Sequence, residues 1–585
     1  MIMIMMDDND YYHYHSSKPI FILKKMNKLE LKRLAVKYYE ENKVPQEIEN
    51  LLNILFLQQP KDLYGYMSDY FGSKSCSPTI SEITYQSALS PAGYKSLEAV
   101  VSCCIHGVVK EIANLQLIFD NRPAMAPVTY KSVERKDTKA KKKDILVENV
   151  TIDLGTKSVT EEKQLPGFSY ERLCFVIKMV MTPALIGACI NDQSDIDERL
   201  RIAIERYSSE ALYKEHNACV DFIEVNVNEC LNTSENHSAD SELSNMCEFE
   251  IKQGSFFLSI MSSYASNCLK NQSYYLYTMQ EKYSIPVPAL NILSCSCSTP
   301  GKLNLFKEIW ILPKRNIKVD QGAHMLLNFY KYIEQLLLQK FGVSGCLKSF
   351  LSGEFTPAFD KPEQLFDFIM TAIKSFSPNA QPSFDIILHL AAHEFYDMKL
   401  NKYEISAGTS KTKEDLLQMY KSWVELYPII GFIDPFHAND GSSYILLHSA
   451  LSSSCYIFSS QAFNEKTVKK MLNEKLVDGF LINPEEVCQT LSDALCLVNL
   501  IKDHSGNLIM RDQWFSKQSN SLAVDLSISF GCLFFQISST NSMSLCRLVS
   551  CYSELKRKGC LIEEESYAFK NILNVLNENH VDNVK

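Results

Sequence analysis

The sequence predicts an α/β protein whose C-terminal half is a closed eight-stranded barrel. Eight short apolar runs of strand-like composition follow one another from residue 285 to residue 538. Several of them are separated by stretches with helical period, such as residues 463–477 and 484–501. Alternation of strands and helices is typical of right-handed βα units and a largely parallel sheet. Eight candidate strands in one stretch fit a closed barrel better than an open sheet.

Length and composition limit the class of protein. A chain of 585 residues is expected to hold roughly two to four domains. Its 46% hydrophobic and 22% charged residues are typical of a protein with a buried core. The net charge of −10 argues against a nucleic-acid-binding protein, because such proteins usually carry a basic face.

The sequence also indicates the compartment. No apolar run is long enough to span a membrane, and the N-terminus lacks the basic region and cleavage site of a secretory signal. The 19 cysteines are scattered, without the spacing of a zinc site or a disulfide framework. We therefore expect a cytoplasmic protein with reduced thiols, with neither a membrane nor a nucleic acid as its partner.

Residues 26–75 are expected to form a small helical module after a disordered tail at residues 1–25. Two apolar stripes with helical spacing lie on either side of Pro45: Leu31, Leu34, Ala35 and Tyr38 before it, and Ile48, Leu51, Leu52 and Leu55 after it. So small a helical hairpin cannot bury both faces alone, and a second copy of the chain would cover them. The alternative is a plain hairpin that packs on the rest of the chain.

This segment resembles the dimerisation and docking domain of the RII-type regulatory subunit of cAMP-dependent kinase. The resemblance rests on the helix–Pro–helix pattern and on the aromatic tail at residues 62–71. It implies a homodimer whose paired hairpins bind an amphipathic helix of an anchoring protein through residues 28–71. The dimer and docking face would be formed by Leu34, Tyr38, Leu51 and Leu55.

Six segments in chain order resemble segments of the enolases. They are residues 114–132, 181–200, 285–293, 305–313, 393–397 and 427–436. The resemblance implies an enolase-like N-terminal α+β domain over residues 95–284 and a TIM-type α/β barrel over residues 285–585. Two polar segments, near residues 131–165 and 226–250, would be insertions in the first domain. An enolase body behind a docking-type N-terminus resembles the enolase-4 branch of the family, which implies a sperm flagellum or a cilium as the setting.

The resemblance also assigns the positions of the enolase active site, and most of them are substituted. Enolases hold Mg²⁺ with three carboxylates, and His389, Ile433 and Ser460 stand at those positions here. The other substituted positions are Asn483 for the base lysine, Gln513 and Trp514 for the substrate clamp, Gln536 for the second lysine, and Ser298 or Thr299 for the loop histidine. The acids Glu308 and Glu354 are retained.

These substitutions predict a catalytically impaired enolase homologue with a structural or scaffold role and no metal cofactor. An amide at the base position has no useful proton affinity, and a site without Mg²⁺ loses much of its stabilisation of negative charge. The alternative is an active phosphopyruvate hydratase, a glycolytic lyase that uses Mg²⁺ to interconvert 2-phosphoglycerate and phosphoenolpyruvate. A third interpretation is a different activity built on His393, Glu394 and Asp397.

Overall fold

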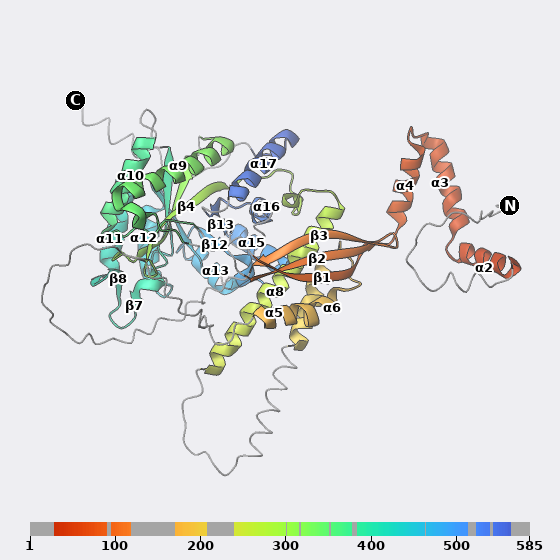
Figure 1. The fold of residues 1–585 in the computed structure, drawn as a ribbon, viewed down its shortest axis with the longest axis horizontal. Helices are drawn as coiled ribbons and strands as arrows, with labels where there is room; N and C mark the ends of the chain where they lie inside the picture. Colours follow the sequence, from red (N-terminus) through yellow and green to blue (C-terminus); the bar gives the residue numbers. More distant parts are fainter. Residues whose placement is uncertain are drawn as a thin grey trace, which may run out of the picture. The chain divides into compact units, whose positions relative to one another are not determined.

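The computed structural model shows two compact units, residues 1–76 and residues 77–585 (Figure 1). The residues that it describes are 28–89, 95–118, 170–207, 239–299, 301–314, 317–349, 353–376, 383–461, 464–512, 522–538 and 542–562. The expected tail at residues 1–25 and the expected insertion at residues 131–165 lie outside these ranges.

The second unit opens with a three-stranded antiparallel sheet. Its strands are β1 (Thr79–Leu89), β2 (Lys95–Ile105) and β3 (Val108–Ile118). This sheet begins before residue 95, where the sequence analysis placed the start of the domain. The earlier start follows from the pairing of β1, which runs along β2 from Thr79 opposite Cys104 to Leu89 opposite Lys95.

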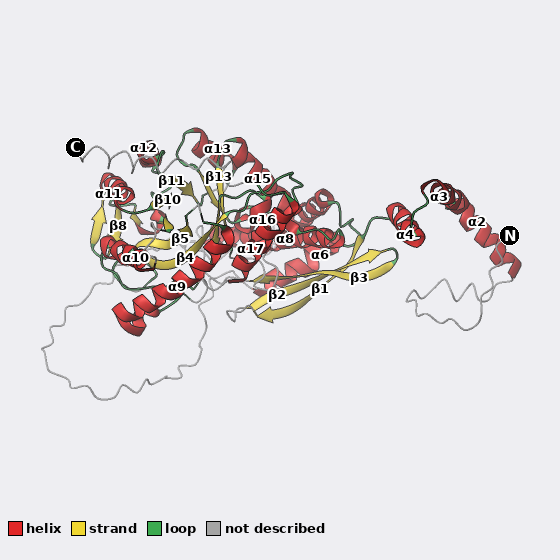
Figure 2. Cartoon of the chain, turned by 90° about the horizontal axis from the view of Figure 1, so that it is seen from above, coloured by secondary structure: helices red, strands yellow, loops and turns green. Residues whose placement is uncertain are grey.

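Helices cover one side of this sheet (Figure 2). They are α5 (Tyr170–Val176), a π-helical turn (Ile177–Met181), α6 (Thr182–Leu185), a helix over residues 193–207, and α8 (Ala239–Leu269). Residues 239–250 were expected to belong to a polar loop, and this prediction is wrong because they form the first turns of α8. Later turns of α8 pack against β2 and β3, and helical hydrogen bonds propagate outward from such a packed segment at little further cost. Residues 226–238 lie outside the described ranges.

The eight-stranded barrel expected from the sequence is confirmed and is closed. Its strands are β4 (Val287–Ser296), β5 (Leu305–Pro313), β6 (Phe384–His389), β10 (Ile429–Ile433), β11 (Tyr456–Ser459), β12 (Gly479–Ile482), β13 (Asn507–Arg511) and β14 (Phe534–Ile537). One strand departs from the parallel arrangement, since β5 runs antiparallel to both β4 and β6. Residues 297–304 join β4 to β5 without a helix, so the chain turns back instead of crossing over.

Helices fill the connections between the other strands (Figure 1). They are α9 (Val319–Phe341), α10 (Pro362–Phe376), α11 (Lys413–Leu426), α12 (Gly441–Leu451), α13 (Glu465–Asn473), α14 (Pro484–Val487), α15 (Leu491–Asp503), α16 (Leu522–Ser529) and α17 (Ser542–Lys558). A small sheet of β7 (Tyr396–Asp397), β8 (Lys402–Ser406) and β9 (Thr409–Lys411) follows β6. Capping boxes begin α11 at Thr412 and α15 at Thr490.

One buried carboxylate ties the N-terminal domain to the barrel. Asp197, in the helix over residues 193–207, is fully buried. Its Oδ2 accepts hydrogen bonds from the backbone N–H (3.0 Å) and the hydroxyl (2.5 Å) of Ser492, in the first turn of α15. Its Oδ1 accepts from Ser259 of α8 (2.5 Å), whose hydroxyl oxygen accepts from the N–H of Leu491 (2.9 Å). The first N–H groups of a helix lack partners within the helix, so the N-terminal domain supplies part of the cap of α15.

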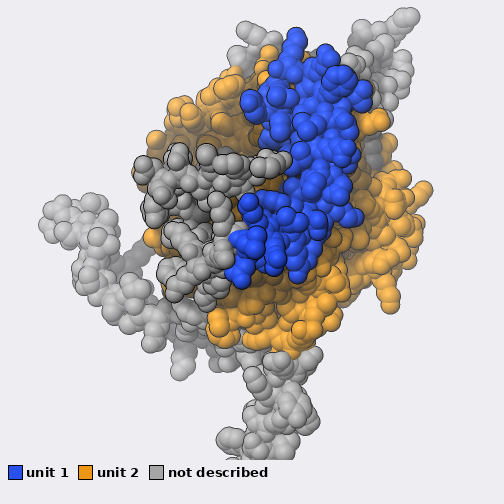
Figure 3. Space-filling model, turned by 90° about the vertical axis from the view of Figure 1, so that its right-hand side faces the viewer, with its two compact units in different colours: residues 1–76 blue, residues 77–585 orange. Residues whose placement is uncertain are grey.

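The first unit is blue in Figure 3, and its described residues form three helices where two were expected. They are α2 (Lys28–Glu41), α3 (Val44–Gln58) and α4 (Leu63–Lys74). The segment at residues 62–71, expected as a tail, is helical because Asp62 caps α4 by accepting from the N–H of Gly65 (2.9 Å). Lys74 of α4 forms an ion pair with Glu47 of α3.

The four residues of the expected docking face do not share one exposed surface. Leu51 and Leu55 are 1% and 8% exposed, whereas Leu34 and Tyr38 are 44% and 60% exposed. The apolar residues of α3 extend beyond one stripe, so one side of the helix is buried while an adjacent side, with Leu52 (58% exposed) and Phe56 (76% exposed), faces solvent.

No helix in the described ranges is long and apolar enough to cross a membrane. The cysteines in those ranges are all free thiols.

Candidate functional site

The mouth of the barrel gathers most of the positions that the family resemblance assigns to the active site. Alternate residues of a strand point to the same side, and side chains such as Trp310, Ile387 and Ile509 form an apolar cluster inside the barrel. On the same three strands, the positions that lie two residues closer to the mouth are occupied by Glu308, His389 and Arg511. The same layer includes Asn291 of β4, Ile433 of β10, Ser460 after β11, Asn483 after β12 and Gln536 of β14.

Strand pairing brings Glu308 and His389 side by side. Glu308 is opposite His389 in the register of β5 with β6. Because β5 runs antiparallel, a residue early in β5 lies at the same level as the last residue of β6. The sequence therefore places an acid and an imidazole together at the mouth although 81 residues separate them in the chain.

Arg511 connects these two side chains. Its Nη1 donates to Glu308 Oε1 at 2.9 Å, and its Nη2 lies 2.9 Å from His389 Nδ1. A guanidinium group only donates, so Nδ1 of the imidazole accepts and Nε2 carries the proton. Nε2 faces Oδ2 of Asp434 at 3.7 Å. All four side chains are at least nine-tenths buried.

Glu308 is held as a carboxylate. Trp310 Nε1 donates to its Oε2 at 2.8 Å, and the guanidinium carbon of Arg511 lies 5.9 Å from the centre of the Trp310 ring. Burial alone would raise the pKa of Glu308, but the charge of Arg511 outweighs it and holds this pKa well below its usual range. An acid that stays ionised cannot supply a proton to a leaving group near neutral pH.

Asp434 is the second buried carboxylate of the mouth. It follows β10 with a left-handed backbone (φ 47°), which aims its carboxylate at the end of β11. Ser459 Oγ (3.0 Å) and the Ser460 N–H (2.9 Å) donate to Oδ1, and Ser460 Oγ donates to Oδ2 at 2.6 Å. Burial would raise the pKa of Asp434, but the contact with His389 and the hydrogen bonds from Ser460 lower it to about 2.

The residues at the three metal positions do not fit Mg²⁺. This ion prefers oxygen ligands in a tight octahedron, usually carboxylates and water. His389, Ile433 and Ser460 offer an imidazole, a hydrocarbon side chain and a hydroxyl that already donates to Asp434. Glu308 is engaged by Arg511. Within the described part of the chain, no group of three or more His, Cys, Asp or Glu side chains is arranged to hold a metal ion.

Three further assigned positions within the described residues are Asn483, Gln536 and Glu354. The side-chain amide of Asn483, which stands where the base lysine was assigned, donates to Glu486 Oε1 at 3.1 Å. The buried amide of Gln536 makes no hydrogen bond with any described residue. Glu354 is buried next to Phe355, which pairs with Leu293 of β4.

Two further assignments concern loops around the mouth. Ser298 and Thr299 lie in the turn after β4, where both hydroxyls bond to Ser296 at 2.9 Å. Gln513 and Trp514 lie outside the described residues.

The cluster considered for a different activity has structural contacts. Glu394 accepts from Lys307 Nζ at 2.7 Å, and Asp397 accepts from the backbone N–H groups of Lys399 and Leu400. Burial lowers the pKa of His393, which favours its neutral form. Glu394 and Asp397 thus serve an ion pair and a turn.

Sequence reasoning missed Arg511, the residue that organises the mouth. Its signal was available, because Arg511 follows Leu508, Ile509 and Met510 at the inward position of a buried strand. A charged residue at such a position is rarely buried without a partner, and the retained Glu308 was a partner of the correct charge.

Comparisons with known proteins agree with the geometry. The family model for the enolase C-terminal TIM barrel domain matches residues 282–573. The chain is 24% identical to enolase 4 of Homo sapiens over 92% of this chain and 90% of the human protein. It is 25% identical to enolase 4 of Danio rerio over 74% and 76% of the two chains. It is also 24% identical to the enolase of Thermococcus kodakarensis over 40% of this chain and 53% of that protein.

Replacing Arg511 tests the importance of the buried cluster. Arg511→Met keeps the volume but leaves the Glu308 carboxylate buried without its cation, so we expect a loss of about 3–5 kcal/mol in the free energy of unfolding, measured in urea. The double variant Glu308→Gln/Arg511→Met should recover most of this loss. Arg557→Met, at an exposed arginine of α17, is the matched control. A loss no larger in Arg511→Met than in Arg557→Met contradicts the assignment.

Stability at acid pH tests Asp434. Its folded-state pKa of about 2 lies below its ordinary value of 3.8, so its contribution, on the order of 2 kcal/mol, is present above pH 4 and is lost as the pH falls toward 2. Asp434→Asn should remove this part of the pH dependence of unfolding. Asp385→Asn should act in the opposite sense, because burial raises the pKa of Asp385 to about 6. If the wild type and Asp434→Asn lose stability equally as the pH falls, the contribution assigned to Asp434 is contradicted.

Proposed function

Because this chain belongs to the enolase family, its barrel mouth corresponds to the enolase active site, and we propose that it is a catalytically impaired homologue with a structural role. The observation that carries this proposal is the buried ion pair between Arg511 and Glu308. This ion pair places a cation at the mouth, but the charge of that cation is already neutralised by Glu308.

The electrostatics of the mouth oppose enolase chemistry. That reaction develops negative charge on an enolate, which enolases stabilise with Mg²⁺ after a base has removed a carbon-bound proton. Here the charge of Arg511 is shared by Glu308 and His389, and the Asp434 carboxylate adds a further negative charge nearby. Among the described residues of the mouth, an anionic substrate would face carboxylates without a free cation, and the amide of Asn483 cannot act as the base.

A structural role is supported by the first unit. Helices α2, α3 and α4 leave large apolar side chains exposed, among them Tyr38, Leu52 and Phe56. So small a helical unit gains stability when another chain covers such surfaces. We propose that a second copy of this chain pairs through residues 28–71 and that the paired helices bind an amphipathic helix of an anchoring protein. The resemblance to the enolase-4 branch supports a flagellum or cilium as the setting.

Enzymatic assay separates this proposal from an active phosphopyruvate hydratase. We expect the purified full chain to convert 2-phosphoglycerate at least about 10⁴-fold more slowly than the Thermococcus kodakarensis enolase, since both base and metal ligands are replaced. Adding Mg²⁺ should leave its melting temperature unchanged. If the activity that converts 2-phosphoglycerate elutes together with the 66.7 kDa chain in gel filtration, the proposal is refuted.

Dimerisation is tested on the exposed side of α3. Leu52→Asp or Phe56→Asp should convert the dimer to a monomer in sedimentation velocity, because a buried charge at the interface costs several kcal/mol. Asn53→Asp adds the same charge at an exposed polar position of the same helix and should leave the dimer intact. A dimer that persists in both apolar variants rules out this face. Leu51→Asp is unsuitable, because Leu51 belongs to the core of the unit.

A further inference from the structure

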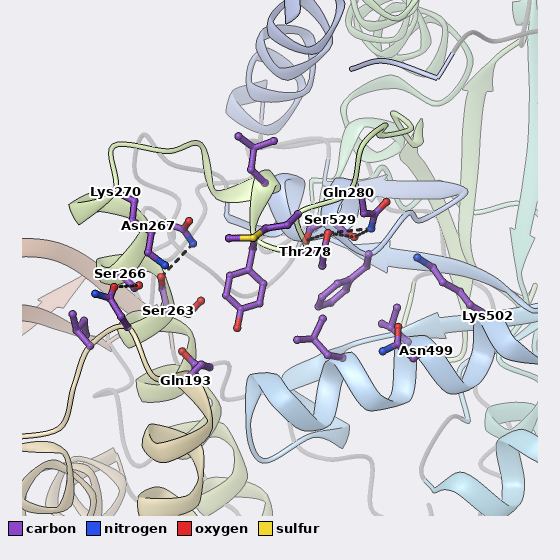
Figure 4. Close-up of a pocket in the computed structure, with 18 residues that line it drawn as sticks. Gln193, Ser263, Ser266, Asn267, Lys270, Thr278, Gln280, Asn499, Lys502 and Ser529 are labelled. Carbon is purple, nitrogen blue, oxygen red and sulfur yellow. Dashed lines mark hydrogen bonds between the residues drawn. The ribbon is translucent and has the colours of Figure 1, made fainter. Parts of the chain in front are cut away.

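A second cavity lies outside the barrel, between the N-terminal domain and two barrel helices. It has a volume of about 520 Å³ and is lined by 18 residues, which come from residues 190–193, α8, the segment after α8, α15 and the end of α16 (Figure 4). Pockets that bind small molecules in proteins measure roughly 300–1,000 Å³. The cavity shares no residue with the cluster at the barrel mouth.

The charge of this cavity has one sign. Lys270 and Lys502 are the charged residues among the 18 that line it, and none of the 18 is Asp or Glu. Figure 4 shows Lys270 on one side of the cavity, at the end of α8, and Lys502 on the other side, on α15. This local balance contrasts with the net charge of −10 of the whole chain. Asp197, the buried acid of the domain contact, accepts a hydrogen bond from the lining residue Gln193 (2.8 Å).

The polar groups between the lysines are held in place. Ser266 Oγ donates to Asn191 Oδ1 at 2.8 Å. On the opposite wall, Gln280 Nε2 donates to Thr278 Oγ1 at 3.0 Å and to the carbonyl of Ser529 at 2.9 Å. Fixed amides and hydroxyls of this kind orient a polar ligand without the cost of ordering them on binding.

We infer that this cavity binds a small phosphate ester. Two ammonium groups on opposite walls suit a ligand that carries negative charge, and the amides and hydroxyls between them suit its sugar or glycerol hydroxyls. Tyr277 and Phe530 in the lining add aromatic surface, so the ester of a nucleoside fits as well as that of a sugar.

The test is calorimetric titration of the full chain with four probes. They are inorganic phosphate, glucose 6-phosphate, adenosine monophosphate and uncharged glucose. We expect one of the two esters to bind saturably, phosphate to bind more weakly and glucose not to bind. The stronger ester identifies the source of the phosphate group. Failure of both esters to bind would overturn the inference, and it would leave the assay at the barrel mouth unaffected.

Variants locate the binding. Lys270→Gln and Lys502→Gln should each raise the Kd of the bound ester roughly tenfold, since each removes a charged hydrogen bond. Lys374→Gln, at an exposed lysine of α10, should leave the Kd unchanged. Melting temperatures of the free variants establish that they are folded. Equal affinity in the two pocket variants and in Lys374→Gln would place the ester elsewhere and refute this site.

Discussion

The arrangement of the barrel mouth depends on one buried ion pair, between Arg511 and Glu308. Removing two charges from water costs several kcal/mol for each ion, and good geometry is needed to offset that cost. Here Glu308 has donors from Arg511 and Trp310, and Arg511 has acceptors in Glu308 and His389. His389 in turn faces Asp434, which Ser459 and Ser460 satisfy. Two of the three residues at the metal-ligand positions, His389 and Ser460, thus belong to one connected network.

This network gives the substitutions a common explanation. Taken one at a time, His389, Ile433 and Ser460 are losses of a carboxylate. Arg511 pairs with Glu308 inside this mouth, so a covalently attached cation balances a buried carboxylate there. Because guanidinium keeps its proton at any physiological pH, the charge of the mouth is permanent and needs no cofactor. The buried charge of Glu308 therefore has a permanent partner within the chain.

The fold was largely predictable from the sequence, and the site was predictable only in part. The hydrophobic periodicity and the composition were sufficient to predict all eight barrel strands, because buried strands are short apolar runs between polar helices. They were insufficient for the direction of β5, which depends on a missing crossover helix, and for the turns of α8 at residues 239–250, which depend on packing further along the helix. The substituted positions followed from the resemblance. Arg511 did not, because its partner Glu308 is 203 residues away in the chain and only barrel closure brings them together.

The hydrogen bonds of Asp197 affect whether the N-terminal domain and the barrel can be stable separately. The start of α15, a barrel helix, takes its partners from Asp197 and Ser259 of the preceding domain. Separating the barrel from the preceding domain would leave those backbone N–H groups without acceptors. It would also leave the buried carboxylate of Asp197 without its donors from Ser492. We therefore expect neither domain to be stable without the other, and the body from residue 77 onward to unfold as one cooperative unit.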